Sequence, residues 1–488
     1  MKGFVLCRGV QDGRRLSAWG GFACCCDVRI MPAQIRGHEG MKVTLIYPGI
    51  GGKGFASLGQ GMDSGWIGHG LAILAPCARQ VGATVDLIDL RALPGWDAFR
   101  AEVERRRPDV VGVSMMSPDY NPAMQSLAIV REVDPNIRTC VGGPHPTICP
   151  GEVQDSPLVD HVFIGEAEVS FPEALRRMML GEAVAKIVPP IAPDLDAIPF
   201  ADRSLFLSEW RRWGYGLESP ETPFVEELPP PFVTVIAGRG CMYNCSYCQP
   251  AERYIFGRTV RRRSVANVIA ELQQLQSEHR FRSFLFHDDC LTEDREWVVD
   301  FCRAYREAGF RQPFFCQSRA DIIVKHEDMV ALMAQAGLRG YLIGFESGSD
   351  RVLRFIRKGT KVWQNLKAAE ICRKYGIAIW ANYMLGIPTE TQEEMRQTIR
   401  MLRRIDPDYY SPAFYTPHPG SDLYAYCEEH GLSLITSHDS YRRNPTEVKI
   451  KGHDPAFLQW ALAESQRRTL ANRVRRRAAY LWRRYAHP

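Results

Sequence analysis

The run Gly240-Cys-Met-Tyr-Asn-Cys-Ser-Tyr-Cys248 places three cysteines within eight residues. Three thiolates at this spacing can bind three irons of a [4Fe–4S] cluster and leave the fourth iron open to another ligand. The alternative is a zinc site, which normally closes with a fourth Cys or His. No histidine occurs between positions 162 and 278, and no other cysteine between 150 and 289. A zinc site would need a distant ligand, so the open cluster is favoured.

The cysteine run follows an apolar segment, 232–237, that is typical of a β-strand. Further short apolar runs alternate with amphipathic stretches, which predict helices such as Val265–Glu278 and Glu393–Arg404. The later strands are expected at Ser283–Phe286, Phe314–Gln317, Gly340–Phe345, Ile377–Leu385 and Tyr409–Tyr415. Six βα units over about 185 residues predict a partial, TIM-like (β/α)6 barrel rather than a closed eight-fold one. Parallel barrels carry their chemistry at the carboxyl ends of the strands, where the cysteines stand.

A second βα series precedes the barrel. Its strands are expected at Val43–Tyr47, Thr84–Asp89, Val110–Ser114, Arg138–Gly142 and His161–Ile164. Its helices are expected at Gly70–Gln80, Trp96–Arg106, Pro122–Val133 and Glu168–Met179. This alternation predicts a doubly wound, flavodoxin- or Rossmann-like parallel sheet that binds ligands beyond the carboxyl ends of its strands. The fold class is therefore α/β.

The 488 residues are enough for two or three domains, and the 45% hydrophobic and 24% charged content is that of a globular protein. We expect an unpatterned extension (disordered, or preceding a true start at Met41), a doubly wound domain, a stiff proline-rich linker, a barrel and a basic helical C-terminal region. These parts are assigned to residues 1–40, 41–187, 188–231, 232–430 and 431–488. No uninterrupted apolar stretch reaches about 18 residues, so no membrane-spanning helix is expected.

Charge and cysteine content bear on partners and location. Residues 455–488 hold eight arginines and one glutamate, a net +7, whereas the whole chain is +5. The basic character therefore belongs to the tail, which predicts a helix capping the barrel, or alternatively a helix resting on anionic lipid. Nucleic acid is not expected as a partner, because no basic surface interleaved with aromatics recurs elsewhere. Fifteen irregularly spaced cysteines indicate a reducing compartment, so a cytoplasmic location is predicted, peripheral to a membrane if the tail binds lipid.

The C-x3-C-x2-C spacing, with Tyr247 just before the last cysteine, resembles the signature of the radical S-adenosylmethionine enzymes. The resemblance implies that Cys241, Cys245 and Cys248 bind the cluster. The open iron would chelate the amino and carboxylate groups of S-adenosylmethionine, whose reductive cleavage releases a 5′-deoxyadenosyl radical. An external electron donor such as flavodoxin or ferredoxin is implied as a partner.

Motifs at the ends of the barrel strands extend this resemblance. Taken singly, an Asp-Asp pair is usually a helix cap and Gly-Ile-Pro a turn. Several such motifs follow one another in the order found in the family, which favours a role in binding S-adenosylmethionine over these ordinary structural roles. The residues implied to bind S-adenosylmethionine are Tyr247, Asp288, Asp289, Arg319, Glu346, Ser347 and Gly386.

The first domain resembles the cobalamin-binding domain that often precedes such barrels. The matching residues, implied to surround cobalamin, are Ser114, Met115, Gly142, Gly143, Pro144, Gly165 and Glu166. The usual Asp-x-His-x-x-Gly motif is missing, because no histidine follows the first strand before His69. We therefore expect base-off cobalamin without a histidine ligand, with His145 lying near the corrin; a flavodoxin-like domain without a corrin is the alternative.

The resemblance implies a cobalamin-dependent C-methyltransferase that uses the radical and methylcobalamin to methylate an unactivated carbon of a small molecule or lipid. The first alternative is an oxidative cyclase or rearrangement enzyme of the same subgroup, and the second is a non-catalytic iron–sulfur or corrin carrier. Tyr383, Tyr415 and His418 are candidates for contact with substrate, although inward aromatics on barrel strands more often serve packing.

Overall fold

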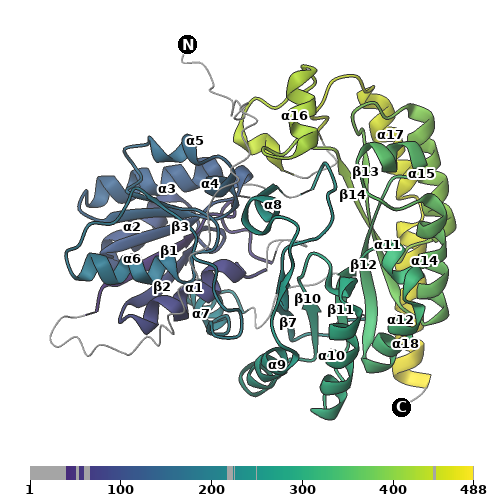
Figure 1. The fold of residues 1–488 in the computed structure, drawn as a ribbon, viewed down its shortest axis with the longest axis horizontal. Coiled ribbons are helices and arrows are strands. Elements are labelled where there is room, and N and C mark those ends of the chain that lie inside the picture. The colour runs from purple at the N-terminus through teal and green to yellow at the C-terminus, as the bar shows by residue number, and fades with distance from the viewer. Residues whose placement is uncertain are drawn as a thin grey trace, which may run out of the picture.

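The computed structural model describes residues 40–50, 54–59, 66–216, 224, 226–248, 250–442 and 447–486. Two α/β lobes lie side by side (Figure 1), each built on a six-stranded parallel sheet. The predicted extension over residues 1–40 falls, except for Gly40, outside the described residues, as does the choice of Met41 as a start.

The first lobe is a doubly wound sheet in the order β2-β1-β3-β4-β5-β6, as predicted. Its strands are β1 (Lys42–Tyr47), β2 (Thr84–Asp89), β3 (Val110–Ser114), β4 (Arg138–Gly142), β5 (His161–Phe163) and β6 (Ile187–Val188). Its helices are α1 (His69–Gln80), α2 (Trp96–Arg106), α3 (Tyr120–Val133), α4 (Pro144–Ile148), α5 (Pro150–Gln154) and α6 (Ser170–Met179), with short 3₁₀ turns η1 (Leu90–Ala92) and η2 (Ser117–Asp119). Buried apolar clusters on both faces of the sheet hold the helices in place.

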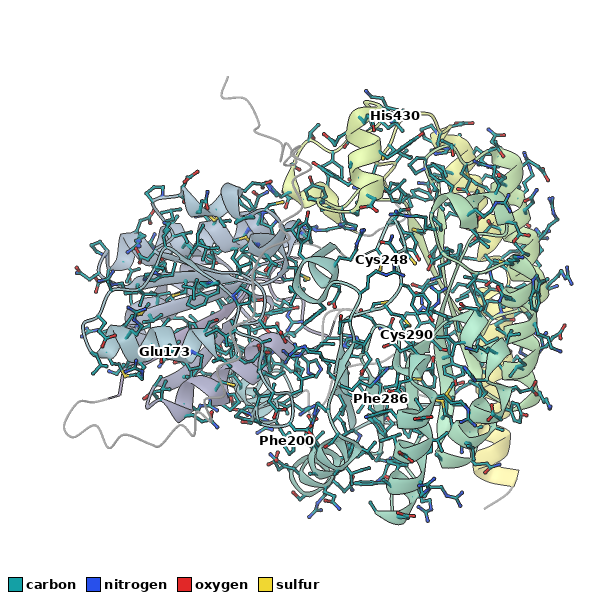
Figure 2. All side chains as sticks on the ribbon, in the orientation of Figure 1. Glu173, Phe200, Cys248, Phe286, Cys290 and His430 are labelled. Carbon is teal, nitrogen blue, oxygen red and sulfur yellow. The ribbon has the colours of Figure 1, made fainter. Side chains whose placement is uncertain are left out.

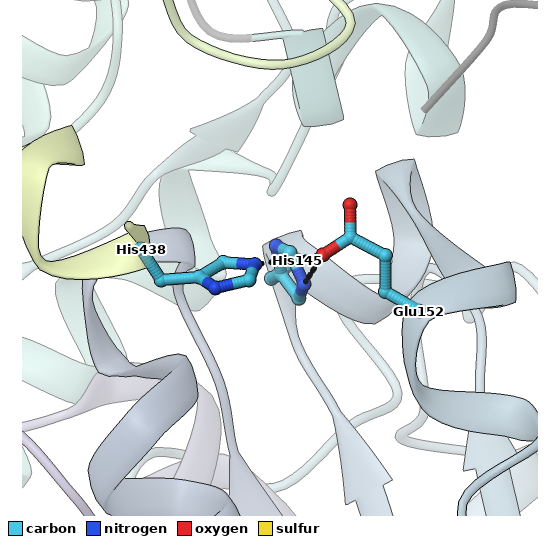
Figure 3. Close-up of side chains that lie close together, drawn as sticks. All are labelled: His145, Glu152 and His438. Carbon is cyan, nitrogen blue, oxygen red and sulfur yellow. Dashed lines mark hydrogen bonds and ion pairs between the residues drawn. The ribbon is translucent and has the colours of Figure 1, made fainter. Parts of the chain in front are cut away.

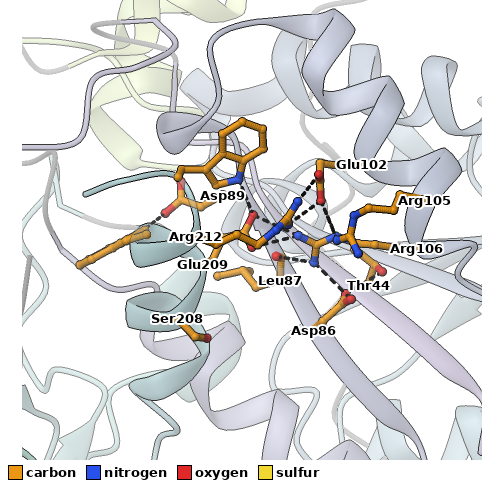
Figure 4. Close-up of polar contacts among 12 residues, drawn as sticks. Thr44, Asp86, Leu87, Asp89, Glu102, Arg105, Arg106, Ser208, Glu209 and Arg212 are labelled. Atoms are coloured by element: carbon orange, nitrogen blue, oxygen red, sulfur yellow. Dashed lines mark hydrogen bonds and ion pairs between the residues drawn. The ribbon is translucent and has the colours of Figure 1, made fainter. Parts of the chain in front are cut away.

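The proline-rich segment after this sheet is more than the stiff spacer that its composition predicts. It contributes β6 to the first sheet and a helix, α7 (Ser204–Arg212), that packs against β2. Trp210 of α7 is fully buried, and its indole N–H donates to Asp89 at 2.8 Å. Figure 4 shows the ionic part of the contact, in which Arg106 of α2 lies 2.9 Å from Glu209. Alternating apolar and charged residues at helical spacing, rather than the prolines, determine the structure here.

The second lobe is the predicted half-barrel, a curled sheet in the order β14-β13-β12-β11-β10-β7. Its strands are β7 (Phe232–Val235), β10 (Ser283–Phe286), β11 (Phe314–Ser318), β12 (Leu338–Glu346), β13 (Ala378–Leu385) and β14 (Tyr409–Phe414). Its helices are α9 (Val265–His279), α10 (Arg295–Glu307), α11 (Ala320–Lys325), α12 (Glu327–Ala336), α13 (Asp350–Phe355), α14 (Val362–Lys374) and α15 (Gln392–Ile405), with a short turn η3 (Leu291–Glu293). The largest buried apolar cluster fills the space between this sheet and its helices.

A small antiparallel pair, β8 (Gly238–Arg239) with β9 (Arg261–Arg262), closes the base of the cysteine segment. Between the two strands the chain forms the cysteine loop and a helix, α8 (Pro250–Phe256). Two-residue strands are too short to show a periodic pattern, so the sequence does not predict them. The pair anchors both ends of the loop to the barrel.

The C-terminal region contains α16 (Asp422–Glu429), the 3₁₀ turn η4 (His438–Tyr441), α17 (Pro455–Ser465) and α18 (Thr469–Ala486). Helix α17 packs against α15 and β13, and α18 packs against β14. Arg475 of α18 lies 2.7 Å from Asp406, and Arg476 stacks on the ring of Tyr409 at 3.9 Å. At least these basic side chains face the barrel, as expected of a capping helix. Within the described part of the chain, no helix combines the length and apolarity needed to span a membrane.

Candidate active site

A cavity of about 430 Å³ opens at the carboxyl ends of the half-barrel strands. Cys248 and Cys290, labelled in Figure 2, both line it. Charged groups stand near the cysteine loop, and the walls from β12, β13 and β14 are largely apolar. The apolar and aromatic lining includes Leu342, Trp380, Tyr383, Met384, Pro412, Phe414 and Tyr415. The cavity therefore offers two different chemical surroundings within one space.

The three cysteines of the loop all line this cavity, with Cys245 buried, Cys241 half-buried and Cys248 exposed. Burial, together with the nearby Cys248 and Asp289, raises the pKa of the Cys241 thiol to about 12. A thiolate in such surroundings needs a cation to balance its charge. Three convergent sulfurs with no fourth protein ligand in the loop fit the open cluster that the spacing predicts.

Arg319 lies against the cysteine loop. Its guanidinium is 3.9 Å from the Cys245 sulfur and 3.6 Å from the centre of the Tyr243 ring. Asp321 accepts hydrogen bonds from Nε and Nη2 along one edge of the guanidinium, at 3.0 and 3.2 Å, which fixes its plane. The fixed positive charge lowers the cost of gathering thiolates, and the residue lines the cavity, as predicted of a group that binds a carboxylate.

Glu346 stands at the end of β12 in a left-handed conformation, with φ of 60°. Its Oε1 accepts from the Tyr247 hydroxyl at 2.8 Å and from Lys358 Nζ at 2.9 Å. Strained backbone of this kind persists where surrounding contacts hold it in place. The sequence predicts Tyr247 and Glu346 but not Lys358, which follows a short helix and belongs to no motif that the sequence analysis considered.

The Asp288-Asp289 pair divides in the structure. Asp288 is buried and accepts from the backbone N–H of Ala237 at 3.0 Å, and it is not among the residues that line the cavity. Asp289 lines the cavity beside Glu252 of α8. Burial and the Asp289 charge raise the pKa of Glu252 to about 8, so the two carboxyls share a proton near neutral pH. The sequence offers no signal for Glu252.

Two other predicted residues lie behind the cavity wall. Ser347 is fully buried, with its hydroxyl 3.3 Å from that of Thr398. Gly386 has a φ of 73°, and a side chain there would contact Leu458 of α17 at 3.2 Å. Its N–H donates to Glu390 at 2.9 Å. Neither residue is among those lining the cavity, so the structure gives no direct contact for the roles predicted from the motif.

Glu390 provides a test of this buried wall. Burial raises the pKa of its carboxyl from 4.5 to about 8. Between these values the folded chain holds a proton that the unfolded chain has lost, so the stability falls as the pH rises through that window and levels off above it. We expect Glu390→Gln to remove up to about 1.4 kcal/mol per pH unit of this slope. Thermal unfolding midpoints from pH 5 to 9 measure it, with the exposed Glu393→Gln as the control. An unchanged slope in Glu390→Gln would contradict the prediction.

The candidate substrate-contact residues all line the cavity. The Tyr383 hydroxyl lies 2.6 Å from that of Ser465 on α17, so its polar end is held by the tail. Tyr415 is buried, and burial raises its hydroxyl pKa well above the usual value. His418 follows β14, and its carbonyl accepts from the Ser421 hydroxyl at 2.8 Å. The Ser465 contact favours a packing role for Tyr383, whereas substrate contact by Tyr415 and His418 stays a prediction.

The first lobe presents the loops predicted for cobalamin at the carboxyl edge of its sheet. Ser114, Gly142 and Gly143 are half-buried there, Pro144 is exposed and Met115 is fully buried. A side chain at Gly143, whose φ is 101°, would lie 3.0 Å from the Met115 backbone. Loop packing therefore requires a glycine here, and its predicted contact with cobalamin stays a prediction. The accessible edge itself lies where doubly wound sheets bind ligands.

Gly165 and Glu166, which follow β5, are also among the residues predicted to surround cobalamin. Gly165 has a φ of 69°, and a side chain there would lie 3.0 Å from Pro190. Glu166 is buried and accepts from Arg239 at 2.5 Å and from Arg261. Both arginines belong to the β8–β9 pair, so Glu166 ties the first lobe to the base of the cysteine loop.

His69 is engaged elsewhere. Its Nε2 lies 2.6 Å from the hydroxyl of Thr234 on β7, and burial lowers its pKa well below the usual value. His69 therefore contacts the barrel lobe. His145, expected near the corrin, is fully buried.

Two family models match the chain. The radical SAM superfamily matches residues 235–402, and the B12 binding domain matches residues 63–175. The chain is a radical S-adenosylmethionine enzyme with a B12-binding domain. The cysteine loop and the half-barrel lie within the first match, and the loops after β3 and β4 within the second.

Similar proteins share both parts of this enzyme. An uncharacterized methyltransferase of Pyrococcus horikoshii is 26% identical over 78% of this chain and 83% of its own length. The anaerobic magnesium-protoporphyrin IX monomethyl ester cyclase of Rubrivivax gelatinosus is 26% identical over 79% of this chain and 69% of its own. The fold resembles that of the solved methyltransferase TsrM from Kitasatospora setae, which has cobalamin and a [4Fe–4S] cluster bound. The two structures align with a TM-score of 0.65 and 16% sequence identity. The alignment covers 88% of this chain and 89% of the TsrM chain.

The radical S-adenosylmethionine enzyme thus has a [4Fe–4S] cluster, S-adenosylmethionine and cobalamin as its cofactors, as the sequence predicts. The three sulfurs converging at one cavity fit the cluster. The accessible edge of the first sheet fits a ligand of the B12 domain. Which individual side chains touch each cofactor stays a prediction.

Proposed function

We propose that this enzyme is a C-methyltransferase acting on an unactivated carbon of a small molecule or lipid. The observation that supports the proposal best is the division of the 430 Å³ cavity into a charged part beside the cysteines and an apolar part beyond it. When bound, the cofactors supply a carbon-centred radical and a methyl group. The protein residues have to bind and orient the cofactors and the substrate, and they have to exclude water.

The charged part suits the amino acid portion of S-adenosylmethionine. Arg319 would bind the carboxylate, because its guanidinium plane is fixed by Asp321 and it lies beside Cys245. Glu346, held by Lys358, would accept from ribose hydroxyls or from the amino group. Asp289 and Glu252 share one proton and can lose it when an ammonium approaches, because the cation then replaces the proton.

The apolar part suits a carbon skeleton. Trp380, Met384 and Phe414 contribute carbon surface to its wall, and the polar end of Tyr383 is turned to Ser465. A hydrocarbon placed there would be shielded from water by this carbon surface. Water exclusion of this kind is what abstraction from a strong C–H bond needs.

A second candidate function is oxidative cyclisation without methyl transfer. The cyclase of Rubrivivax gelatinosus, similar over 79% of this chain, supports it. The cavity would serve both reactions equally, because both begin with the same radical. A non-catalytic carrier is the least favoured, since a carrier has no need of a lined cavity at the cysteine loop.

The deciding experiment uses the full-length chain with its cluster reconstituted anaerobically and cobalamin added. The protein is incubated with S-adenosylmethionine and a flavodoxin or chemical reductant, and the products are analysed by mass spectrometry. A methyltransferase forms S-adenosylhomocysteine as well as 5′-deoxyadenosine and, with its substrate, a product heavier by about 14 daltons. A cyclase forms 5′-deoxyadenosine without S-adenosylhomocysteine, and a carrier forms neither.

The partners follow from this chemistry. The enzyme needs an external one-electron donor, and a small-molecule or lipid substrate that enters the cavity. The packing of α17 and α18 against the barrel supports the capping role of the basic tail over the alternative of membrane contact. A reducing, cytoplasmic setting would keep the eleven cysteines that the described residues hold free of disulfides.

A further inference from the structure

Three side chains from distant parts of the chain meet at the boundary between the lobes (Figure 3). His145 lies on α4, Glu152 on α5 and His438 on η4 of the C-terminal region. Glu152 Oε2 lies 3.4 Å from His145 Nε2 and 2.7 Å from His438 Nε2. The three ligand atoms lie within 4.8 Å of one another. None of these residues has a role in the proposed reaction.

His145 is the residue that points to a ligand. It is fully buried, and its Nδ1 lies 3.2 Å from the Ser117 hydroxyl. Its Nε2 makes no hydrogen bond with any residue that the structure describes, yet it faces the Glu152 carboxylate. When the His145 Nδ1–H donates to the Ser117 hydroxyl, the Nε2 lone pair faces that negative charge, and a cation between the two atoms removes the repulsion.

We propose that His145, Glu152 and His438 bind a divalent transition metal of the zinc class. Two imidazoles and one carboxylate are a common zinc ligand set. Bonds of about 2.0–2.1 Å in a tetrahedral site place ligand atoms about 3.3 Å apart, close to the His145–Glu152 separation. The metal would replace the shorter contact between Glu152 and His438. Ser117 would orient the His145 ring, as hydrogen bonds from the second nitrogen of a metal-bound histidine usually do.

The site would join the C-terminal region to the B12-binding domain. His438 stacks on the ring of Tyr120 with centroids 3.9 Å apart, and Asp439 accepts from Asn121 at 2.9 Å. These contacts bring η4 to the first lobe without a metal, and the metal would lock it there. His145 follows Gly142-Gly143-Pro144 directly, so the lock lies behind the predicted cobalamin loop. The proposal does not depend on methyl transfer.

The test uses full-length, cluster-reconstituted protein, in which iron occupies the three cysteines. Chelator-treated protein is titrated with Zn²⁺ against a chromophoric chelator, and bound metal is counted by mass spectrometry. We expect one zinc per chain in the wild type. We expect Glu152→Gln and His438→Ala each to weaken binding at least about tenfold. His430→Ala, at the residue that follows α16, is the matched control and should bind zinc as the wild type does.

Co²⁺ substitution identifies the ligands. We expect the difference spectrum, with minus without Co²⁺, to show visible cobalt absorption without cobalt–sulfur charge-transfer bands, because the three ligands carry nitrogen and oxygen only. Glu152→Gln preserves size and packing, so its result stands even if His438→Ala folds poorly. The proposal is overturned if the wild type binds no zinc, if Glu152→Gln binds it as tightly, or if cobalt shows thiolate bands.

Discussion

Replacing Cys245 with alanine is expected to abolish the iron–sulfur absorption and to lower formation of 5′-deoxyadenosine at least about 100-fold. Cys245 is buried at the cavity beside the guanidinium of Arg319. With two thiolates left, the loop can no longer bind three irons. Arg319 loses the negative charge that it faces at 3.9 Å, which weakens the remaining sites further. Anaerobic reconstitution followed by iron, sulfide and product analysis measures both effects.

The matched control is Cys290→Ala. Cys290 is also buried and lines the same cavity, and burial raises its thiol pKa to about 12. It lies outside the loop, near Thr292, and is not expected to bind iron. This variant should keep the cluster and most of the activity. Retention of a catalytically competent cluster in Cys245→Ala, or its loss in Cys290→Ala, would reject the assignment of the three loop cysteines.

The fold could be predicted well because both sheets are parallel and buried. Their strands appear as short apolar runs that alternate with amphipathic helices, and each run predicts one strand within a few residues. The sequence does not predict helix α7, because the neighbouring prolines favour an extended linker. In the structure, the apolar face of the helix, including Trp210, is buried. The β8–β9 pair was missed because two-residue strands carry no periodic signal.

The site could be predicted only where its residues belong to a local motif. The cysteines have a spacing that a single loop determines, and the structure brings them to the cavity with Arg319 and Glu346. Lys358 and Glu252 reach the same cavity through tertiary packing, which no local spacing encodes. His438 meets His145 across almost three hundred residues, for the same reason. For Ser347 and Gly386 the motif is misleading in the opposite way. It places both residues near the site, but in the structure they lie behind the cavity wall.

Gly344→Ala is expected to lower 5′-deoxyadenosine formation at least about 100-fold while leaving the thermal stability nearly unchanged. A methyl group at Gly344 would overlap with Glu346 Oε1 and would lie 2.7 Å from Lys358 Nζ. Both atoms are the ends of flexible side chains that border the cavity, so they can move at little cost to the core. Their displacement breaks the 2.9 Å ion pair and withdraws the Tyr247 hydroxyl from its acceptor. Binding of S-adenosylmethionine by equilibrium dialysis should weaken with the activity.

Stability and activity have to be measured on the same preparation, because a general loss of folding would also lower turnover. Gly70→Ala, on α1, supplies the control: a methyl group there meets no atom within 4 Å, so the change should leave the activity unchanged and raise the stability slightly. An active Gly344→Ala enzyme would show that the Glu346–Lys358 pair does not orient the cofactor. A Gly344→Ala enzyme that loses its cluster or unfolds early would show that the pair supports the fold instead. Because the substitution moves only side-chain ends, these outcomes separate a binding role from a structural one.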